Sequence, residues 1–361
     1  MKLRITIGKS QALITLLCLF TSISFVPAFC QQETVEEHLI VLLAEFPDRK
    51  LGKNADDIKL VLDEVDTLFE EASFNKLSLN STVMPTKYMM PNTLAHYDKS
   101  SFDNTQFFRD LITMADRDIN FHDSWLLVYH AGDTSPTGNA IHRQAITDDD
   151  EIIRGFARVD STTRSIPVTL HELAHLFGNL PDLYDRSRPV GDITNQYQSD
   201  IFYYDLDIMG AKTHGGFSAY SRIKLGWFDD NVLVVKPGED KRVMLTPVES
   251  CNDGICAVQI PVNDERYYLI ESREIISKQD QALQPKFEGI TITYVDESIP
   301  SGRGPVKLLN INGYSTQFIE KHAYNTDSLF ISPDHGFMLT IEDDNTIRIK
   351  PAENVSYYTP K

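Results

Sequence analysis

The chain has 361 residues, of which 42% are hydrophobic and 24% charged, and its formal net charge is −18. This composition is typical of globular proteins and excludes a disordered, collagen-like or low-complexity chain, and the length allows two domains with sizeable cores. Because an acidic surface repels phosphate backbones and anionic lipid, nucleic-acid binding is not expected.

Residues 1–30 have the layout of a signal peptide. A basic start is followed by a stretch without charge from Ser10 through Gln32, and small residues precede a cleavage site after Cys30. A retained membrane anchor is the alternative, which the serines and threonines in the stretch disfavour. Cleavage removes three basic and no acidic residues and leaves a net charge of −21. We therefore expect a secreted, extracellular protein with no stable membrane insertion.

Residues 31–230 alternate between strand and helix patterns. The apolar run at 38–46 is typical of a buried strand, and the helical spacing of apolar residues at 58–72 predicts an amphipathic helix capped near Asn54. A second helix is predicted at 104–116 and a second buried strand at 125–130. This order of elements predicts an α+β domain.

From residue 231 the pattern changes to short β-rich segments separated by Gly, Pro, Asn and Asp. This pattern of short strands and turns predicts an all-β, sandwich-like domain over 231–361. Its two cysteines, Cys251 and Cys256, enclose a four-residue loop prone to turn, so in an exported chain we expect them to form a disulfide.

One motif carries chemistry: residues 171–175 read His-Glu-Leu-Ala-His. On a helix, His171 and His175 share a face and can reach one metal ion, and the carboxylate of Glu172 lies beside them as a general base. Apolar flanking residues support a helix, with Gly178 as its C-cap. The alternative is a buried helix with two hydrogen-bonded histidines.

A catalytic zinc needs a third protein ligand. A turn after Gly178 would bring Asp182 or Asp185 under the metal. A glutamate from a later helix is disfavoured, because the chain has no glutamate between Glu172 and Glu239.

Further along the chain, residues 207–210 read Asp-Ile-Met-Gly, which is short and turn-like. After a zinc helix followed by a glycine turn, Met209 looks like the methionine of the Met-turn in metzincins. The simpler alternative is the end of a strand with one core methionine.

Several segments together resemble the immune inhibitor A family of secreted metallopeptidases, in family order and over most of the mature chain. These segments are VLLAEFPD at 41–48, SFNKLSL at 73–79, LLVYHAG at 126–132, LPDLYD at 180–185, DIMG at 207–210, FSAYSRIKLGW at 217–227, YYLIESR at 267–273 and GITITYVD at 289–296. The chain departs from the family by one extra residue between Gly178 and Asp182.

The resemblance implies a metzincin-like zinc metallopeptidase domain that hydrolyses protein or peptide substrates. It implies Zn²⁺ held by His171, His175 and Asp182, with Asp185 or a water as the alternative third ligand, and Glu172 as the general base. His214 and Tyr220 are candidates to stabilise the transition state, against the alternative of an ordinary loop histidine and a core tyrosine.

A structural Ca²⁺ ion is a further possibility, with candidate ligands in the acidic run at 148–151 and at Asp185, Asp205 and Asp207. Two other functions stay open. The first is a secreted non-catalytic binding or adhesion module that keeps the fold, and the second is a hydrolase of a non-peptide bond. The sequence indicates neither the cleavage preference nor the oligomeric state.

Overall fold

The computed structural model describes residues 34–99, 105–132, 138–147, 149–161, 165–185, 206–210, 216–228, 230–275, 288–309, 323–324, 326–332 and 335–352. The expected signal peptide therefore lies outside the described residues. All of the described residues belong to one unit, Thr34–Lys361.

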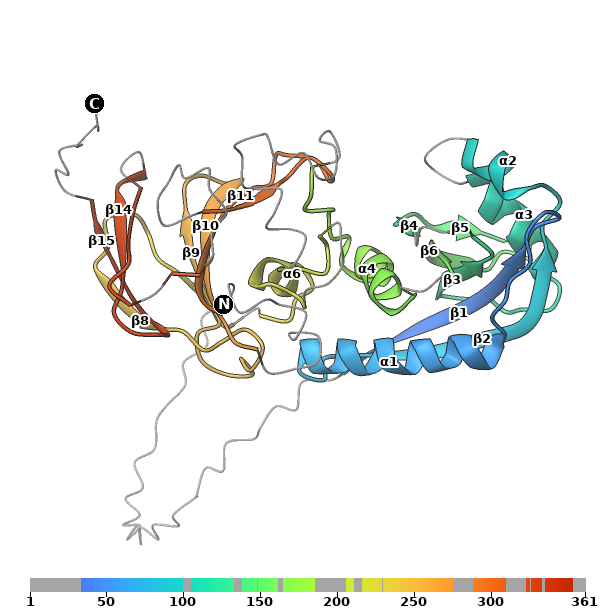
Figure 1. Ribbon diagram of the computed structural model, residues 1–361, viewed down its shortest axis with the longest axis horizontal. Coiled ribbons are helices and arrows are strands. Elements are labelled where there is room, and N and C mark those ends of the chain that lie inside the picture. The colour runs from blue at the N-terminus through green and yellow to red at the C-terminus, as the bar shows by residue number, and fades with distance from the viewer. Residues whose placement is uncertain are drawn as a thin grey trace, which may run out of the picture. The chain divides into compact units, whose positions relative to one another are not determined.

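A mixed sheet forms the centre of the N-terminal part (Figure 1). Its strand order is β2-β1-β3-β6-β4, and β5 also pairs with β6. Strands β2, β1, β3 and β6 run parallel to one another, whereas β4 and β5 are antiparallel to β6. The strands are β1 (Val35–Glu45), β2 (Leu77–Met89), β3 (Ser124–His130), β4 (Gly138–Ile141), β5 (Ala145–Ile146) and β6 (Ile152–Asp160).

The helices described in this part are α1 (Ala55–Ser73), α2 (Leu94–Lys99), α3 (Thr105–Ala115), α4 (Ser165–Gly178) and α6 (Ala219–Lys224). Helix α1 begins where the sequence predicts, because Asn54 and Asp57 exchange side-chain and backbone hydrogen bonds in a capping box. The predicted helix at 104–116 and strand at 125–130 correspond to α3 and β3.

Helices cover both faces of this sheet. In the register between β3 and β6, Trp125 lies beside Gly155 on one face and Leu126 beside Phe156 on the other. Phe177 of α4 packs 5.7 Å from the Trp125 ring, and Phe108 of α3 packs 4.4 Å from the Phe156 ring. Helices α4 and α3 therefore lie on opposite faces, and every residue of β3 is buried.

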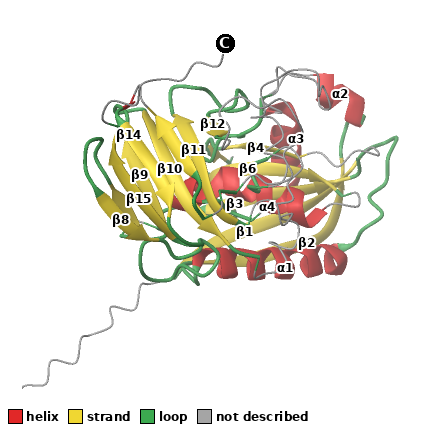
Figure 2. Ribbon diagram, turned by 60° about the vertical axis from the view of Figure 1, so that its left-hand side comes forward, coloured by secondary structure: helices red, strands yellow, loops and turns green. Residues whose placement is uncertain are grey.

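The C-terminal part consists of two sheets (Figure 2). One has the order β12-β11-β10-β9-β7 and the other β13-β14-β15-β8. Apolar side chains from both sheets meet in one buried cluster, as expected for a sandwich, whereas Leu269, Val295 and Val306 of the former sheet pack with the core of the N-terminal part. The strands are β7 (Val232–Val234), β8 (Lys241–Met244), β9 (Ala257–Pro261), β10 (Arg266–Arg273), β11 (Gly289–Asp296), β12 (Val306–Leu308), β13 (Leu329–Ser332), β14 (Phe337–Ile341) and β15 (Thr346–Pro351).

The chain is thus mixed α/β, with several sheets and few helices. The α+β expectation differs in one respect: four neighbouring strands of the first sheet run parallel, because α1 connects β1 to the adjacent parallel strand β2. A disulfide joins Cys251 and Cys256, with an S–S distance of 2.01 Å. None of the helices in the described ranges combines the length and the apolar character needed to cross a bilayer.

Candidate metal centre

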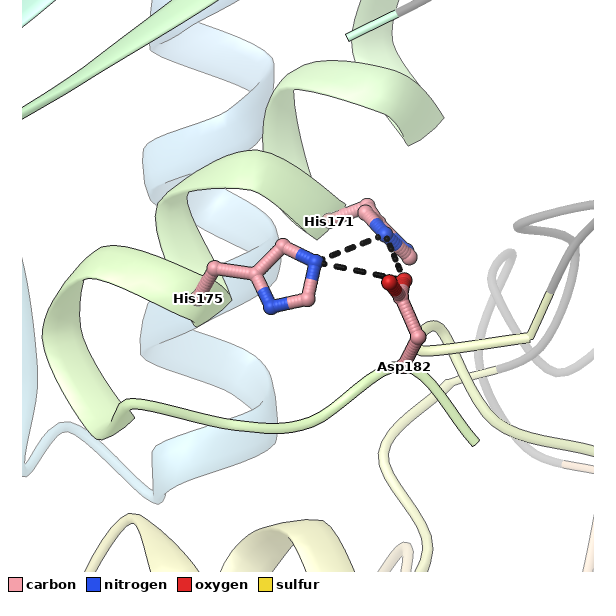
Figure 3. Close-up of side chains that lie close together, drawn as sticks. All are labelled: His171, His175 and Asp182. Carbon is pink, nitrogen blue, oxygen red and sulfur yellow. Dashed lines mark hydrogen bonds and ion pairs between the residues drawn. The ribbon is translucent and has the colours of Figure 1, made fainter. Parts of the chain in front are cut away.

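Two histidines of α4 lie on successive turns of the helix and face the same point (Figure 3). The Nε2 atoms of His171 and His175 are 3.1 Å apart, and their ring centroids are separated by 4.7 Å. His171 is buried and His175 half-buried. The spacing of four residues on a helix produces this arrangement, as the motif predicts.

Backbone carbonyls fix the orientation of both rings. The Nδ1 atom of His171 lies 2.7 Å from the carbonyl oxygen of Ile208, and that of His175 lies 2.5 Å from the carbonyl oxygen of Leu180. A carbonyl oxygen can only accept a hydrogen bond, so each Nδ1 carries the hydrogen. In the neutral rings, each Nε2 is then left with the lone pair that a metal ion binds.

Asp182 completes the cluster from the segment that follows α4 (Figure 3). Its Oδ1 lies 3.3 Å from Nε2 of His171 and 3.4 Å from Nε2 of His175, and its side chain is 2% exposed. Burial raises the pKa of Asp182, but when the two histidines are protonated their Nε2 hydrogens and charges outweigh burial and hold this pKa well below its ordinary value. The carboxylate is therefore the stable form.

These three side chains fit a metal ion. One ligand atom from each of His171, His175 and Asp182 lies within 4.8 Å of the others. Two imidazole lone pairs and a carboxylate are all acceptors, and three acceptors at such distances repel one another unless a cation lies between them. The donor set of nitrogen and oxygen could therefore hold a metal ion.

Asn179, the first of the three residues between Gly178 and Asp182, makes the turn that brings Asp182 to the histidines. It has φ +48°, a left-handed conformation that asparagine tolerates and that ends many helices. The expectation that Gly178 caps α4 is thus wrong, because Gly178 is the last residue of the helix. A Cβ atom on Gly178 would lie 2.5 Å from Cδ2 of Leu225, so this glycine permits close packing instead.

The predicted turn at 207–210 lies against His171. Its Ile208 carbonyl accepts the hydrogen bond from His171, and the carbonyl of Met209 accepts one from the backbone of Leu183. The Met209 side chain is fully buried.

The Asp207 carboxylate accepts hydrogen bonds from the backbone N–H groups of Met209 and Ser218 and from the hydroxyls of Ser218 and Ser221. Asp207 therefore shapes this turn.

Glu172 and both histidines line a cavity of about 750 Å³. Glu172 is 5% exposed and packs directly on the backbone of β4: a Cβ atom added to Gly138 would lie 2.2 Å from its Oε1. The lining also includes Glu297 and Ser301 of the C-terminal part. A carboxylate next to the candidate metal ligands in an open cavity can exchange protons with a bound reactant.

Tyr220 also lines this cavity, together with Lys224 and Glu297. The ammonium of Lys224 lies 2.9 Å from Oε1 of Glu297, and Tyr267 donates a hydrogen bond to the same oxygen at 2.9 Å. Burial and the nearby carboxylates, chiefly Glu297, raise the pKa of Tyr220, so its hydroxyl keeps its proton. His214, the other candidate stabiliser, lies outside the described residues.

A second acidic group lies away from this cavity. Carboxylate oxygens of Asp116, Asp149 and Glu151 lie within 4.8 Å of one another. The Asp149 carboxylate accepts a hydrogen bond from the hydroxyl of Thr147, and that of Glu151 accepts one from the backbone of Phe121. Asp148 and Asp205 lie outside the described residues, so a calcium site remains a prediction.

No family model matches the chain, and no curated protein matches it. Distant likenesses exist among solved structures. A chaperone–substrate complex matches with a TM-score of 0.27 and 19% identity over 42% of this chain and 24% of that chain. Metalloproteinase-II from Bacteroides fragilis matches with a TM-score of 0.32 and 13% identity over 54% of each chain. Wild-type OgpA from Akkermansia muciniphila matches with a TM-score of 0.31 and 12% identity over 76% of this chain and 92% of that chain.

The chain therefore spans about a quarter and about half of the first two of these structures. A metalloproteinase is among these weak structural neighbours. TM-scores near 0.3 do not establish a common fold. The function of this chain is accordingly argued from its own residues.

Two contributions to the site carry no signal in the sequence. Gly138 contacts Glu172 only because β4 lies at the edge of the sheet next to α4. Ser301 accepts a hydrogen bond from the backbone N–H of Asp182 at 2.9 Å across 119 residues of chain. Neither residue belongs to a motif, so only the tertiary structure shows their role.

Proposed function

We propose that this chain is a secreted zinc-dependent endopeptidase with a metzincin-like catalytic domain, related to the immune inhibitor A family. The observation that carries the proposal is the convergence of His171, His175 and Asp182 beside Glu172 in one open cavity. The order of family-like segments along the sequence supports it.

The ligand chemistry favours zinc. Two imidazole nitrogens and one carboxylate oxygen are ligands that zinc accepts, whereas calcium takes oxygen ligands almost exclusively. Three protein ligands are the number that leaves a coordination position open at a catalytic zinc site. When bound, zinc would supply Lewis acidity, which lowers the pKa of a water and polarises a peptide carbonyl.

The chain's own residues move the proton. Glu172 accepts the proton of the attacking water and then donates it to the amine of the leaving peptide. Packing against the backbone of Gly138 restricts the position of the Glu172 side chain. Tyr220, in the wall of the same cavity, is the candidate hydrogen-bond donor to the oxyanion, together with His214.

Secretion is part of the proposal. It rests on the signal-peptide layout of residues 1–30 and on the disulfide between Cys251 and Cys256, a bond that forms in oxidising compartments. After cleavage of the signal peptide, the proposed mature protein begins at Gln31.

The test is cleavage of unfolded casein by purified 31–361 beside Glu172→Gln, with bound zinc measured in both. We expect zinc in both proteins and cleavage by the wild type only, because glutamine removes the base and leaves the three ligands. Wild-type activity in Glu172→Gln would overturn the role of Glu172. Zinc in both without cleavage by either would favour a peptidase with a narrow substrate range or the non-catalytic binding module.

A further inference from the structure

The third ligand has no helix to hold it. His171 and His175 are fixed by α4, but Asp182 lies in a segment without regular secondary structure. Its carboxylate position therefore depends on what holds its backbone. Both backbone hydrogen-bonding groups of Asp182 are engaged by a single loop, the β11–β12 loop (297–305) of the C-terminal part.

The contacts form a short ladder. The Asp182 N–H donates to Oγ of Ser301 at 2.9 Å, and the N–H of Gly302 donates to the carbonyl of Asp182 at 2.9 Å. Three residues further on, Asp185 forms an antiparallel bridge with Arg303. The segment that carries the ligand thus runs alongside this loop like an added strand.

The loop has a defined shape of its own. Gly302 and Gly304 have φ values of +71° and +73°, which favour glycine, and these turns direct residues 301–303 toward Asp182. At the other end of the loop, the hydroxyl and N–H of Ser298 both donate to the Asp296 carboxylate. The β11–β12 loop therefore presents Ser301 from a structured support.

Two further contacts from the C-terminal part reach the same neighbourhood. On β10, the Glu271 carboxylate accepts a hydrogen bond from the N–H of Ala219 at the start of α6, and Arg273 donates to the carbonyl of Leu206 at 3.3 Å. Leu206 directly precedes the turn whose Ile208 carbonyl orients His171. The sandwich thus supports the metal centre at more than one point.

We propose that the C-terminal β-sandwich is a structural part of the metal centre, with Ser301 as a positioning residue for Asp182. This inference rests on the proposed function for its metal. Removing the Ser301 hydroxyl leaves the backbone N–H of Asp182, a 2% exposed residue, without its acceptor and frees the carboxylate to move away from the histidines.

The test uses the full mature chain and measures metal affinity, not activity. The variants are Ser301→Ala, Ser301→Thr, which keeps the hydroxyl, and Ser250→Ala, which removes an exposed serine hydroxyl of the C-terminal part that contacts the Pro247 carbonyl. Zinc affinity is measured by competition with a chromophoric chelator, and the geometry of the site by the visible absorption of bound Co²⁺.

We expect Ser301→Ala to weaken zinc binding by at least about tenfold, the usual cost of losing a residue that orients a ligand, and to change the Co²⁺ spectrum. Ser301→Thr and Ser250→Ala should stay close to the wild type. Equal affinities for Ser301→Ala and Ser250→Ala would overturn the inference. If Ser301→Ala does not fold, hydrogen exchange of the Asp182 amide in the wild type decides: protection supports the inference, and exchange at the rate of an unstructured chain overturns it.

The outcome is separable from that of the proposed function. A wild-type chain that binds zinc but cleaves no protein would end the proposed activity, while the affinity series would still test the role of Ser301. A wild-type chain that binds no zinc would overturn both.

Discussion

Helix α4 and the segment 179–185 both contribute ligands to the candidate metal centre, but their ligands are held in place by different means. The two histidines of α4 are brought together by the local geometry of one helix, with their Nε2 atoms 3.1 Å apart. Asp182 reaches them through a left-handed residue at Asn179 and through hydrogen bonds to a loop 119 residues away. A ligand on a helix needs only its neighbours in sequence, whereas a ligand on a loop needs the rest of the fold.

The largest expected effect comes from a substitution on helix α4. His171→Ala removes a ligand, and we expect the chain to lose stoichiometric zinc and with it all peptidase activity, because three protein ligands are needed. The matched control is His142→Ala. His142 lines the same cavity and its Nδ1 lies 2.8 Å from the Leu176 carbonyl, but it is not one of the three ligands. One zinc per chain in His171→Ala would contradict the assignment.

Removal of the metal should lower the stability of both regions together. With free zinc at about a thousand times its dissociation constant, binding adds about 4 kcal/mol to the free energy of unfolding. Thermal melts in EDTA and in zinc should therefore give clearly separated midpoints. Protons compete with the metal for the histidine Nε2 atoms, so this difference should shrink as the pH is lowered. Identical midpoints in EDTA and zinc would argue against a metal that links the helix to the loop.

Gly138→Ala tests the position of Glu172 without altering a ligand. The new Cβ would lie 2.2 Å from Oε1 and 2.5 Å from Cγ of Glu172, so the side chain must turn away. We expect kcat to fall by about 10²-fold, the usual contribution of a positioned acid–base group, with zinc content unchanged. Adding Gly138→Ala to Glu172→Gln should cause little further loss. A large further loss would show that Gly138 acts through something other than Glu172.

The smallest expected effect concerns the turn that joins the two regions. At Asn179, with φ +48°, alanine should destabilise the chain by about 1 kcal/mol, whereas glycine should be nearly neutral. Urea unfolding of metal-free protein measures both variants. A destabilisation as large for Asn179→Gly as for Asn179→Ala would mean that the asparagine side chain, not its backbone conformation, holds the turn.

The elements that the sequence predicts are those with strong local patterns. The apolar run of β1, the capping box of α1 at Asn54 and the spacing of His171 and His175 all depend on neighbouring residues. Strand β2 gives no such pattern. It lies at the sheet edge, contains Pro85, and alternates poorly because much of it is exposed. Without β2, the order of the strands in the sheet cannot be derived.

The residues of the candidate site also differ in whether a local sequence pattern predicts them. The sequence predicts His171, Glu172 and His175 from one motif and leaves Asp182 and Asp185 as alternatives for the third ligand. Because the turn has one extra residue, the sequence does not decide between these two aspartates. The left-handed conformation of Asn179 brings Asp182 into the cluster. Gly138 and Ser301 contact the site through tertiary packing alone, and no local pattern identifies such residues.

The hydrogen bond between Asp182 and Ser301 has a consequence for the order of assembly. Synthesis proceeds from the N-terminus, and the early part of a chain can begin to fold before the rest is complete. The partner of Asp182 is made 119 residues after it, so the histidine pair can form while the third ligand is still unsupported. During synthesis, the chain therefore carries an incomplete candidate metal centre, which is completed only when the β11–β12 loop folds against it.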